Sequence, residues 1–348
     1  MKFAIGVGLR GLASSSDPKV DMVRYVQAAE AAGVDYAWSA ESWGRDAVTS
    51  IAYLAAKTTR ITLGTGIMQV TARTPVMTAM TALSLSELSD GRFALGLGVS
   101  GPQVVEGLHG VPFNPALTRL KENVAIVRQA IAGERIEFEG KVYELPRKGG
   151  QGKALKLDHK HRPDLPIYLA TLGSRSLQYT GEAADGWLGT SFSPDSPDAL
   201  LGPIKQGAKA AGRTLDEIDL QASATVCVTD KVDEVVHSLK PGIAFQLGAM
   251  GSAQTNFYNA AFSRAGFVDD AKAVQRLWLD RKRDEAARRV PDALVHHYAM
   301  VGSEQHVRER LAIYRGAGIT TINVRFPPMR TGERIPQLER ALDTLRST

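Results

Sequence analysis

The sequence predicts an α/β fold, a (β/α)8 TIM barrel with insertions, and three observations lead to it. Eight short apolar segments recur along the chain without the polar alternation of half-exposed strands, as parallel strands buried on both faces require. A segment with helical patterning follows each of them. The 348 residues fit two average domains or one barrel, and the lack of a linker or composition break favours a single domain over residues 1–348.

Strands and helices alternate along the whole chain, and local signals mark several of their ends. Asp17 and Pro18 open the first helix, and Gly33 ends it. Strands are expected at residues 2–9, 34–39, 61–68, 93–99, 167–170, 187–191, 220–228 and 320–325. Helices are expected at 18–32, 46–57, 75–88, 115–132, 175–184, 197–211 and 333–345, with one more between the last two strands.

Two insertions interrupt this rhythm, at about residues 134–165 and 241–290. The first contains a predicted hairpin, RIEFEGKVYEL, and then a loop rich in Gly, Lys and His. The second is expected to begin with a Gly-rich loop and to continue with two polar helical stretches. Both lie between one strand and the next, where barrels carry active-site loops. We therefore expect residues 241–265 to form a mobile wall or lid over the substrate side, and the alternative is a static dimer contact.

Composition and charge argue against several kinds of partner. The net charge is +5, and the densest basic run, residues 281–289, also carries two acidic residues, so it is interpreted as a solvated helix face and not a nucleic-acid surface. No apolar run approaches the length of a membrane span, and the N-terminus lacks a signal-peptide pattern, which predicts a cytoplasmic protein. The single cysteine, Cys227, is expected to be a buried hydrophobic residue, and no histidine spacing is typical of a metal site.

The pattern Gly-x-Gly-x-x-Gly occurs at residues 6–11 and 96–101, each time after a predicted strand. In a dinucleotide-binding fold the third glycine lies at the start of a helix. In the first copy five residues separate it from the helix cap, and in the second a proline follows at once, so both are interpreted as chance matches. Gly98 and Ser100 remain candidates for lining a ligand pocket at the end of their strand.

The pattern of residues 166–191 predicts an anion-binding site, which we call the anion seat. The segment reads as strand, turn, helix and strand, with Gly173 and Ser174 at the helix start and Arg175 beside them. The N–H groups and the dipole of a helix start attract an anion, and a guanidinium adds a fork of donors. A phosphate seat is one interpretation, and an ordinary Ser174 cap with a turn glycine is the other.

Two further strand ends carry candidate residues. The strand that begins at residue 61 ends in Gly64-Thr65-Gly66, where glycine would admit a flat ligand close to the backbone or would allow a strand bulge. Glu41, at the end of the second strand, could be catalytic, could orient a cofactor or could be solvated.

Several of these segments resemble the luciferase-like monooxygenase family, and most closely its branch that uses the deazaflavin coenzyme F420, which includes methylenetetrahydromethanopterin reductase. The resemblance is clear over residues 1–230 and looser beyond them. It implies a barrel that binds a flavin or deazaflavin at the carboxyl ends of its strands, and it suggests a homodimer. The segments that carry it are DYAWSAESW, ITLGTGIMQVTARTP, SDGRFALGLGVSG, AGERIEFEGKVYEL and PIYLATLGSRSLQYTGEAADGW.

The resemblance implies roles for individual residues. Glu41 and Ser42 stand at the position of an acid–histidine pair, from which Ser42 departs. The bond between Gly66 and Ile67 stands at the position of a non-prolyl cis peptide that supports the ring. The full expected cofactor-binding set, which adds residues beside the ring and the phosphate, is Glu41, Ser42, Gly66, Ile67, Gly98, Ser100, Gly101, Gly173, Ser174, Arg175 and Thr190.

Two positions depart from relatives of this branch. Some relatives carry a carboxylate as proton donor after the fourth strand, where this chain has Gly101 and Pro102. The reductase has a glutamate in its first strand, where this chain has Gly6. The substrate chemistry of these relatives therefore does not transfer. The remaining candidates for acid–base catalysis are Glu41, Glu106, His109 and residues 241–265.

The sequence thus predicts an F420-dependent oxidoreductase that transfers a hydride between C5 of the deazaflavin and a small organic substrate. The alternative is an FMN-dependent monooxygenase of the same fold that uses reduced flavin and O2. A non-catalytic flavin- or F420-binding protein is a third hypothesis, and a nicotinamide-dependent Rossmann enzyme is a distant fourth. No metal, nucleic acid or membrane is expected as a partner.

Overall fold

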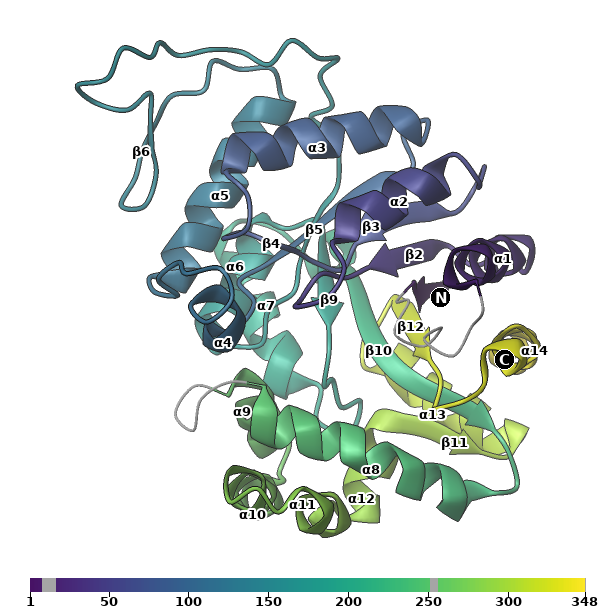
Figure 1. The fold of residues 1–348 in the computed structure, drawn as a ribbon. Helices are drawn as coiled ribbons and strands as arrows, with labels where there is room; N and C mark the ends of the chain where they lie inside the picture. Colours follow the sequence, from purple (N-terminus) through teal and green to yellow (C-terminus); the bar gives the residue numbers. More distant parts are fainter. Residues whose placement is uncertain (8–16, 251–255, 348) are drawn as a thin grey trace. The chain divides into compact units, whose positions relative to one another are not determined.

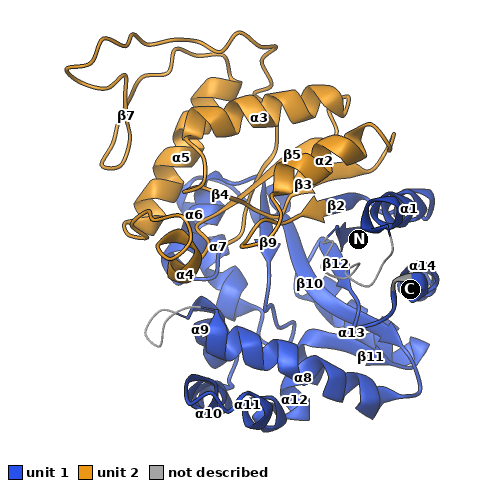
Figure 2. Cartoon of the chain, in the orientation of Figure 1, with its two compact units in different colours: residues 1–37, 171–348 blue, residues 38–170 orange. Residues whose placement is uncertain are grey.

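A computed structural model describes residues 1–7, 17–250 and 256–347 of the protein. Parallel strands and helices alternate along it (Figure 1). The chain divides into two compact units (Figure 2). Unit 1, blue in the figure, comprises residues 1–37 and 171–348, and unit 2, orange, comprises residues 38–170. Whether the chain behaves as the single domain expected above stays a prediction.

Unit 2 contains a parallel sheet and the helices that follow its strands. The strands are β3 (Thr62–Thr65), β4 (Met68–Gln69), β5 (Phe93–Gly98) and β8 (Ile167–Leu169), and β2 (Tyr36–Ser39) ends in this unit. The helices are α2 (Ala47–Ala55), α3 (Pro75–Leu88), α4 (Pro102–Val105) and α5 (Ala116–Ile131). β5 pairs with β3, β4 and β8, and all six of its residues are buried, as expected for a strand covered on both faces.

Side-chain caps fix the starts of two of these helices. Asp46 accepts a hydrogen bond from the N–H of Thr49 at 2.7 Å at the start of α2. Thr74 caps α3, and Pro75 occupies its first position, where a missing N–H costs nothing. The loops after β2 and β4 are therefore held at both ends by regular structure.

A single buried carboxylate anchors the insertion at 134–165. Its hairpin is formed by β6 (Phe138–Glu139) and β7 (Glu144–Leu145), which pair antiparallel, so the predicted hairpin is confirmed. Glu122 on α5 accepts hydrogen bonds from three successive backbone N–H groups of the hairpin turn, those of residues 141, 142 and 143, at 2.7, 2.9 and 2.9 Å. The Glu122 residue is 8% exposed, and the three donors balance its burial.

Unit 1 contains a second set of parallel strands. They are β1 (Lys2–Gly6), β9 (Gly186–Gly189), β10 (Asp219–Val228), β11 (Ala299–Gly302) and β12 (Thr321–Arg325). β12 lies between β1 and β10. β9 pairs with the first residues of β10, and β11 pairs with the last ones. β10, with ten residues, is therefore the strand that ties the sheet of this unit together.

The helices of unit 1 are more numerous than its strands. They are α1 (Pro18–Ala31), α6 (Ser174–Ala183), α7 (Asp198–Ala210), α8 (Val232–Ala249), α9 (Phe257–Arg264), α10 (Val268–Leu279), α11 (Arg283–Arg289), α12 (Asp292–Tyr298), α13 (Glu304–Gly316) and α14 (Arg334–Arg346). A hydrophobic cluster formed by α8 to α12, together with Cys227 and β11, gives the second insertion its own core. The expectation that Cys227 is buried is confirmed.

The prediction of a Gly-rich loop from residue 241 is wrong for the residues that the structure describes. Residues 241–249 continue α8, with Pro241 inside the helix. Gly248 serves close packing and not loop freedom, because a Cβ at this position would overlap the Trp278 ring. Residues 251–255 of the expected lid lie outside the described residues, whereas the amphipathic stretch after them forms α9.

Strand bounds also differ from the expected ones. The strand expected at 61–68 is divided into β3 and β4, and the first strand ends at Gly6, with residues 8 and 9 outside the description. β11 was not predicted, since its four residues are too short to show a pattern and are identified only by their pairing with β10. No described helix is long and apolar enough to cross a membrane.

A partly exposed ion-pair cluster joins the loop after β9 to α13 within unit 1. Arg310 makes two hydrogen bonds to the carboxylate of Asp195, at 3.0 and 2.9 Å. His297 Nδ1 lies 3.3 Å from the same carboxylate. The bidentate bond from Arg310 holds the pKa of Asp195 below its usual range, and burial lowers the pKa of His297.

Candidate active site

The residues expected to bind a cofactor follow the carboxyl ends of strands in both units. In unit 2 they follow β2, β3 and β5, and in unit 1 they follow β8 and β9. These are the ends at which parallel α/β sheets place their ligands.

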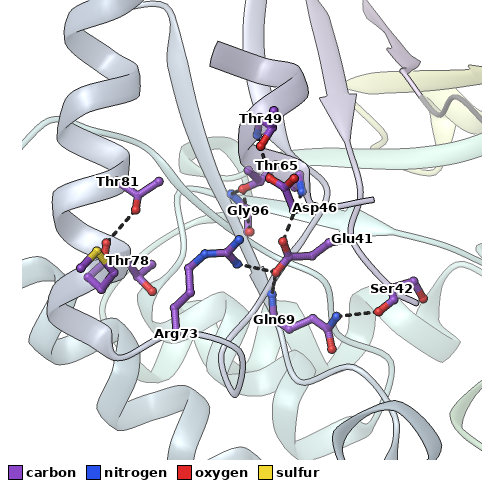
Figure 3. A network of polar contacts seen from close by, with 12 residues as sticks. Glu41, Ser42, Asp46, Thr49, Thr65, Gln69, Arg73, Thr78, Thr81 and Gly96 are labelled. Atoms are coloured by element: carbon purple, nitrogen blue, oxygen red, sulfur yellow. Dashed lines mark hydrogen bonds and ion pairs between the residues drawn. The ribbon is translucent and has the colours of Figure 1, made fainter. Parts of the chain in front are cut away.

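Glu41 is the centre of a polar network in unit 2 (Figure 3). We call Glu41, Gln69, Arg73 and the first residue of α2, Ala47, the Glu41 frame. The Glu41 Oε1 atom accepts hydrogen bonds from Arg73 Nη1 at 2.6 Å and from the backbone N–H of Gln69 at 2.9 Å. Oε2 accepts one from the N–H of Ala47 at 3.2 Å. The Glu41 side chain is 6% exposed, so this geometry suits a positioning group, and its catalytic role stays a prediction.

The Glu41 frame reaches Ser42 through Gln69. The Gln69 Nε2 atom donates to the backbone oxygen of Ser42 at 3.1 Å, which fixes the loop after β2. Gln69 itself is 3% exposed, and its Oε1 atom is buried with no hydrogen-bond partner among the described residues. Ser42 is exposed, so its hydroxyl is open to a ligand while its backbone is held.

Gly66 and Ile67 lie against the Glu41 frame. The N–H of Gly66 donates to the oxygen of Ser39 at 2.6 Å, and the N–H of Glu41 donates to the oxygen of Ile67 at 3.3 Å. The peptide bond between Gly66 and Ile67 is cis, as the resemblance implies. Both residues are half-buried, so the segment presents backbone and one apolar side chain at the end of β3.

Gly98 lies next to Ile67. A Cβ on Gly98 would come within 3.0 Å of Ile67 Cδ1, and a Cβ on Gly66 would come within 3.1 Å of Trp38 Cβ. Both glycines therefore allow a closer approach than a larger residue would. The structure brings Glu41, Ser42, Gly66, Ile67 and Gly98 together, in one part of unit 2.

The loop after β5 adds two of the expected residues. Ser100 has a φ of 59°, in the left-handed region, and Gly101 precedes α4 as its N-cap. A Cβ on Gly101 would meet only Gln103 Oε1, at 3.8 Å, so the space beside this glycine is open. Both residues are half-buried, which leaves them accessible at the end of the strand.

Glu106 and His109 are exposed on the loop beyond α4. Glu106 Oε1 accepts a hydrogen bond from the N–H of Phe113 at 3.0 Å, which closes this loop. Among the described residues, neither side chain contacts the Glu41 frame. Their proposed acid–base role stays a prediction without geometric support.

The predicted anion seat lies at the start of α6. Gly173, and not Ser174, is the N-cap, so the alternative in which Ser174 caps the helix is wrong. Gly173 has no side chain that could cap the first turn, and the Ser176 hydroxyl donates to the oxygen of Gly173 at 2.8 Å. Ser174 and Arg175 are exposed, and thus the N-terminus of this helix of ten residues is available to an anion.

A pocket of about 620 Å³ opens beside this helix start, within unit 1. It is lined by Ser174, by residues of α7 and by Arg264 of α9. Lys205, Lys209 and Arg264 give it three positive charges, and Asp198 gives it one negative charge. The pocket therefore favours an anion, as the helix start does. Thr190, which follows β9, is half-buried. Among the described residues it is not part of the lining of this pocket.

Sequence reasoning missed the residues that complete both regions. Gln69 and Arg73 lie inside the segment ITLGTGIMQVTARTP, so a signal existed, but only the structure shows that both contact Glu41. Lys205, Lys209 and Arg264 come from helices that carry no distinguishing pattern. No group of His, Cys, Asp and Glu among the described residues could hold a metal ion.

Comparison with known proteins identifies the family of this chain. Residues 1–321 match the luciferase-like monooxygenase family. A provisionally named coenzyme F420-dependent oxidoreductase of Mycobacterium tuberculosis is 38% identical over 332 residues, which cover 93% of this chain and 94% of the relative. A 5,10-methylenetetrahydromethanopterin reductase of Methanolobus tindarius is 31% identical over 297 residues, covering 76% of this chain and 88% of the relative.

A solved structure shows the same fold. The coenzyme F420-dependent tetrahydromethanopterin reductase of Methanopyrus kandleri superposes with a TM-score of 0.79 at 24% identity and covers 99% of this chain and 96% of its own. This likeness confirms the predicted fold class, an α/β barrel with eight parallel strands. The chain is thus a luciferase-like oxidoreductase, and it belongs to the luciferase-like monooxygenase family.

Proposed function

We propose that this protein is an F420-dependent oxidoreductase that transfers a hydride between the deazaflavin and a small organic substrate. The observation that carries the proposal is the segment of Gly66 and Ile67, packed on Gly98 and fixed by the Glu41 frame. The names of two relatives, an F420-dependent oxidoreductase and a reductase of a methanopterin, support it.

The residues of unit 2 fit a flat ring. A ring needs an apolar surface and close backbone, and Ile67 and the glycines at 66 and 98 supply both. Glu41 holds this surface in place through Gln69 and Arg73, so little reorganisation would accompany binding. Ser42, Ser100 and Gly101 offer accessible polar groups beside it.

The residues of unit 1 fit a phosphate. The uncapped first turn of α6 offers backbone N–H groups, Ser174 adds a hydroxyl donor, and Arg175 adds a guanidinium fork. Gly173 leaves space at the turn, because a Cβ there would meet only Ser176 Oγ at 3.5 Å. A phosphate is common to F420 and FMN, so this region supports either cofactor.

The chemistry divides between cofactor and protein. A deazaflavin supplies a two-electron hydride carrier when bound. The part of this chain is to position two flat partners, to exclude water and to supply or remove a proton. Glu41 has three partners of its own, and we therefore assign it to positioning and leave the proton donor to the substrate side.

Titration of the purified protein with F420 and with FMN, followed by fluorescence, tests the proposal. We expect F420 to bind more tightly than FMN, and reduced F420 to be oxidised in the presence of an organic acceptor. Tight binding of FMN alone, with O2 consumption from reduced FMN, would instead identify a monooxygenase. The homodimer and the cytoplasmic location stay predictions, and light scattering measures the first of them.

A further inference from the structure

β10 and β12 are neighbouring strands in unit 1 (Figure 1), and alternate residues along them share a polar face. Along β12 the side chains of Ile322 and Val324 are buried, at 0% and 2% exposure, and on the neighbouring strand Phe3 faces Arg346 of α14. Because side chains alternate along a strand, Asn323 and Arg325 point to the opposite face. This face is accessible, since Asn323 is half-buried and Arg325 is exposed.

The adjacent strand adds hydroxyl groups to this face. In the parallel register Ser223 stands beside Asn323, and Thr225 stands beside Arg325. Both hydroxylic residues are half-buried, whereas the alternating residues Ala222 and Ala224 are buried. The face therefore carries two hydroxyls, one amide and one guanidinium, and Arg325, the last residue of β12, lies at the strand end where parallel sheets present ligands.

Gly6 leaves room on this face. β1 pairs with β12, with Ala4 beside Asn323 and Ile5 beside Val324, so Gly6 follows at the level of Arg325. A Cβ at Gly6 would meet no atom within 4 Å. β1 therefore places no side chain in the space beside Arg325 at the level of Gly6.

Arg325 has no counter-ion among the described residues. Its side chain makes no ion pair or hydrogen bond to them, whereas the half-buried Arg310 of the same unit pairs with Asp195. The Arg325 residue is exposed, and the surrounding protein still desolvates its charge enough to lower its pKa.

From this arrangement we infer that Arg325 and Thr225, beside the space that Gly6 leaves open, form a subsite for an anionic group of the substrate, a carboxylate or a phosphate. An arginine fork matches the geometry of both groups, and the neighbouring hydroxyls can donate to the same oxygens. An anion would also supply the counter-charge that Arg325 lacks among the described residues. The inference deepens the proposed function, on which it rests, by assigning the substrate to organic anions.

The test compares anionic and neutral probes on the full-length protein. Dissociation constants for benzoate, phenyl phosphate and uncharged benzamide are measured by ligand-observed NMR. The variants are Arg325→Met, which removes the charge, and Gly6→Asp, which places a competing carboxylate in the open space. Arg315→Met is the matched control, because Arg315 is exposed at the end of α13, which leads into the start of β12, whereas Arg325 ends that strand.

We expect at least one of the two anions to bind the wild-type protein and the Arg315→Met control more tightly than benzamide does. Affinity for that anion should fall about tenfold or more in Arg325→Met, as expected for loss of a charged hydrogen-bond donor. The Gly6→Asp variant should weaken it as well, while benzamide affinity stays the same. Comparison of benzoate with phenyl phosphate then shows whether the substrate group is a carboxylate or a phosphate.

Two results would overturn the subsite: equal anion affinities in wild type and both variants, or anions that bind no better than benzamide. If Arg325→Met does not fold in a thermal melt, Gly6→Asp decides alone. F420 affinity of the same samples separates the two proposals. A protein that binds F420 but shows no dependence on Arg325 loses only the subsite, and one that shows this dependence but binds no F420 loses only the cofactor assignment.

Discussion

The Glu41 frame in unit 2 and the anion seat in unit 1 treat charge in opposite ways. The charge of Glu41 is balanced by Arg73 and by two backbone donors, and its side chain is almost fully buried. At the start of α6, by contrast, the first turn has no cap, and the pocket beside it carries more positive than negative charge. Donors that are paired with a buried carboxylate stabilise the fold, whereas donors without a partner are available to a ligand. The two regions should therefore respond differently to substitution.

Glu41→Gln should give the largest effect, and it should be an effect on stability. The change removes a buried charge and leaves Arg73 without its partner, which costs about 3 kcal/mol in comparable buried pairs. We expect the free energy of unfolding in urea to fall by this amount. Glu339→Gln, an exposed residue of α14, is the control, and it should leave the urea midpoint unchanged.

A double variant sharpens this first prediction. If Arg73 matters mainly as the partner of Glu41, then adding Arg73→Met to Glu41→Gln should cost less than the sum of the two single changes. Strictly additive free energies would show that the ion pair is not a coupled unit.

The combined change Ser174→Ala and Arg175→Ala should act on binding and not on stability. Both residues are exposed, and neither caps the helix. Loss of a hydroxyl and a guanidinium should weaken F420 binding about tenfold or more, because each bond to a charged group contributes about 1.5–3 kcal/mol. The backbone donors remain, so binding should weaken and not vanish. Fluorescence titration measures it, with Arg315→Ala as control.

Two outcomes would count against the seat. If a cofactor analogue that lacks the phosphate loses as much affinity as F420, the segment acts through the fold. A clear loss of stability in this variant would remove the contrast with Glu41.

Asp195 should show a pH-dependent effect of intermediate size. Its pKa is lowered by the hydrogen bonds from Arg310, so its stabilising contribution is present above the pKa of the unfolded chain and is lost as the pH falls through the lower folded pKa. The lowered pKa of His297 acts in the same direction, because the fold favours the neutral ring. Asp195→Asn should therefore lower Tm at neutral pH, and the difference should shrink in acid. A difference in Tm that is constant with pH would contradict this assignment.

Lys205→Met with Lys209→Met should have the smallest effect. These exposed lysines line the pocket beside Ser174 and act at a distance. We expect a severalfold slower association of F420 at low salt and no difference at high salt, where the charges are screened. Stopped-flow fluorescence at two salt concentrations measures the rate. A difference that persists at high salt would indicate direct contact.

Local patterns made the alternation of strands and helices, and from it the fold class, predictable, and a family resemblance implied the cis peptide at Gly66. Where the prediction failed, local and tertiary signals disagreed. Gly248 and Pro241 favour a loop in isolation, but packing against Trp278 keeps this segment helical. β11 is defined by its pairing with β10, and a segment of four residues carries no sequence pattern that predicts this pairing.

The candidate site was predictable only in part, for a similar reason. Glu41 and Ser174 stand at strand ends and helix starts, which the sequence marks. The positions of their partners are not marked in the sequence in this way. Arg73 lies 32 residues from Glu41, and Arg264 lies on a helix of a distant insertion. Arg325 was predicted only as the last residue of a strand. The sequence alone does not show that Arg325 lacks a carboxylate partner among the described residues.

The attachment of the hairpin through Glu122 bears on how this protein can change over evolutionary time. The three groups that Glu122 binds are main-chain N–H groups, which every residue except proline possesses. Substitutions at positions 141–143 therefore leave the anchor intact, whereas loss of the one glutamate would release the whole turn. A segment attached in this way can diversify its side chains at little risk to the barrel beneath it, and new specificities could arise there first.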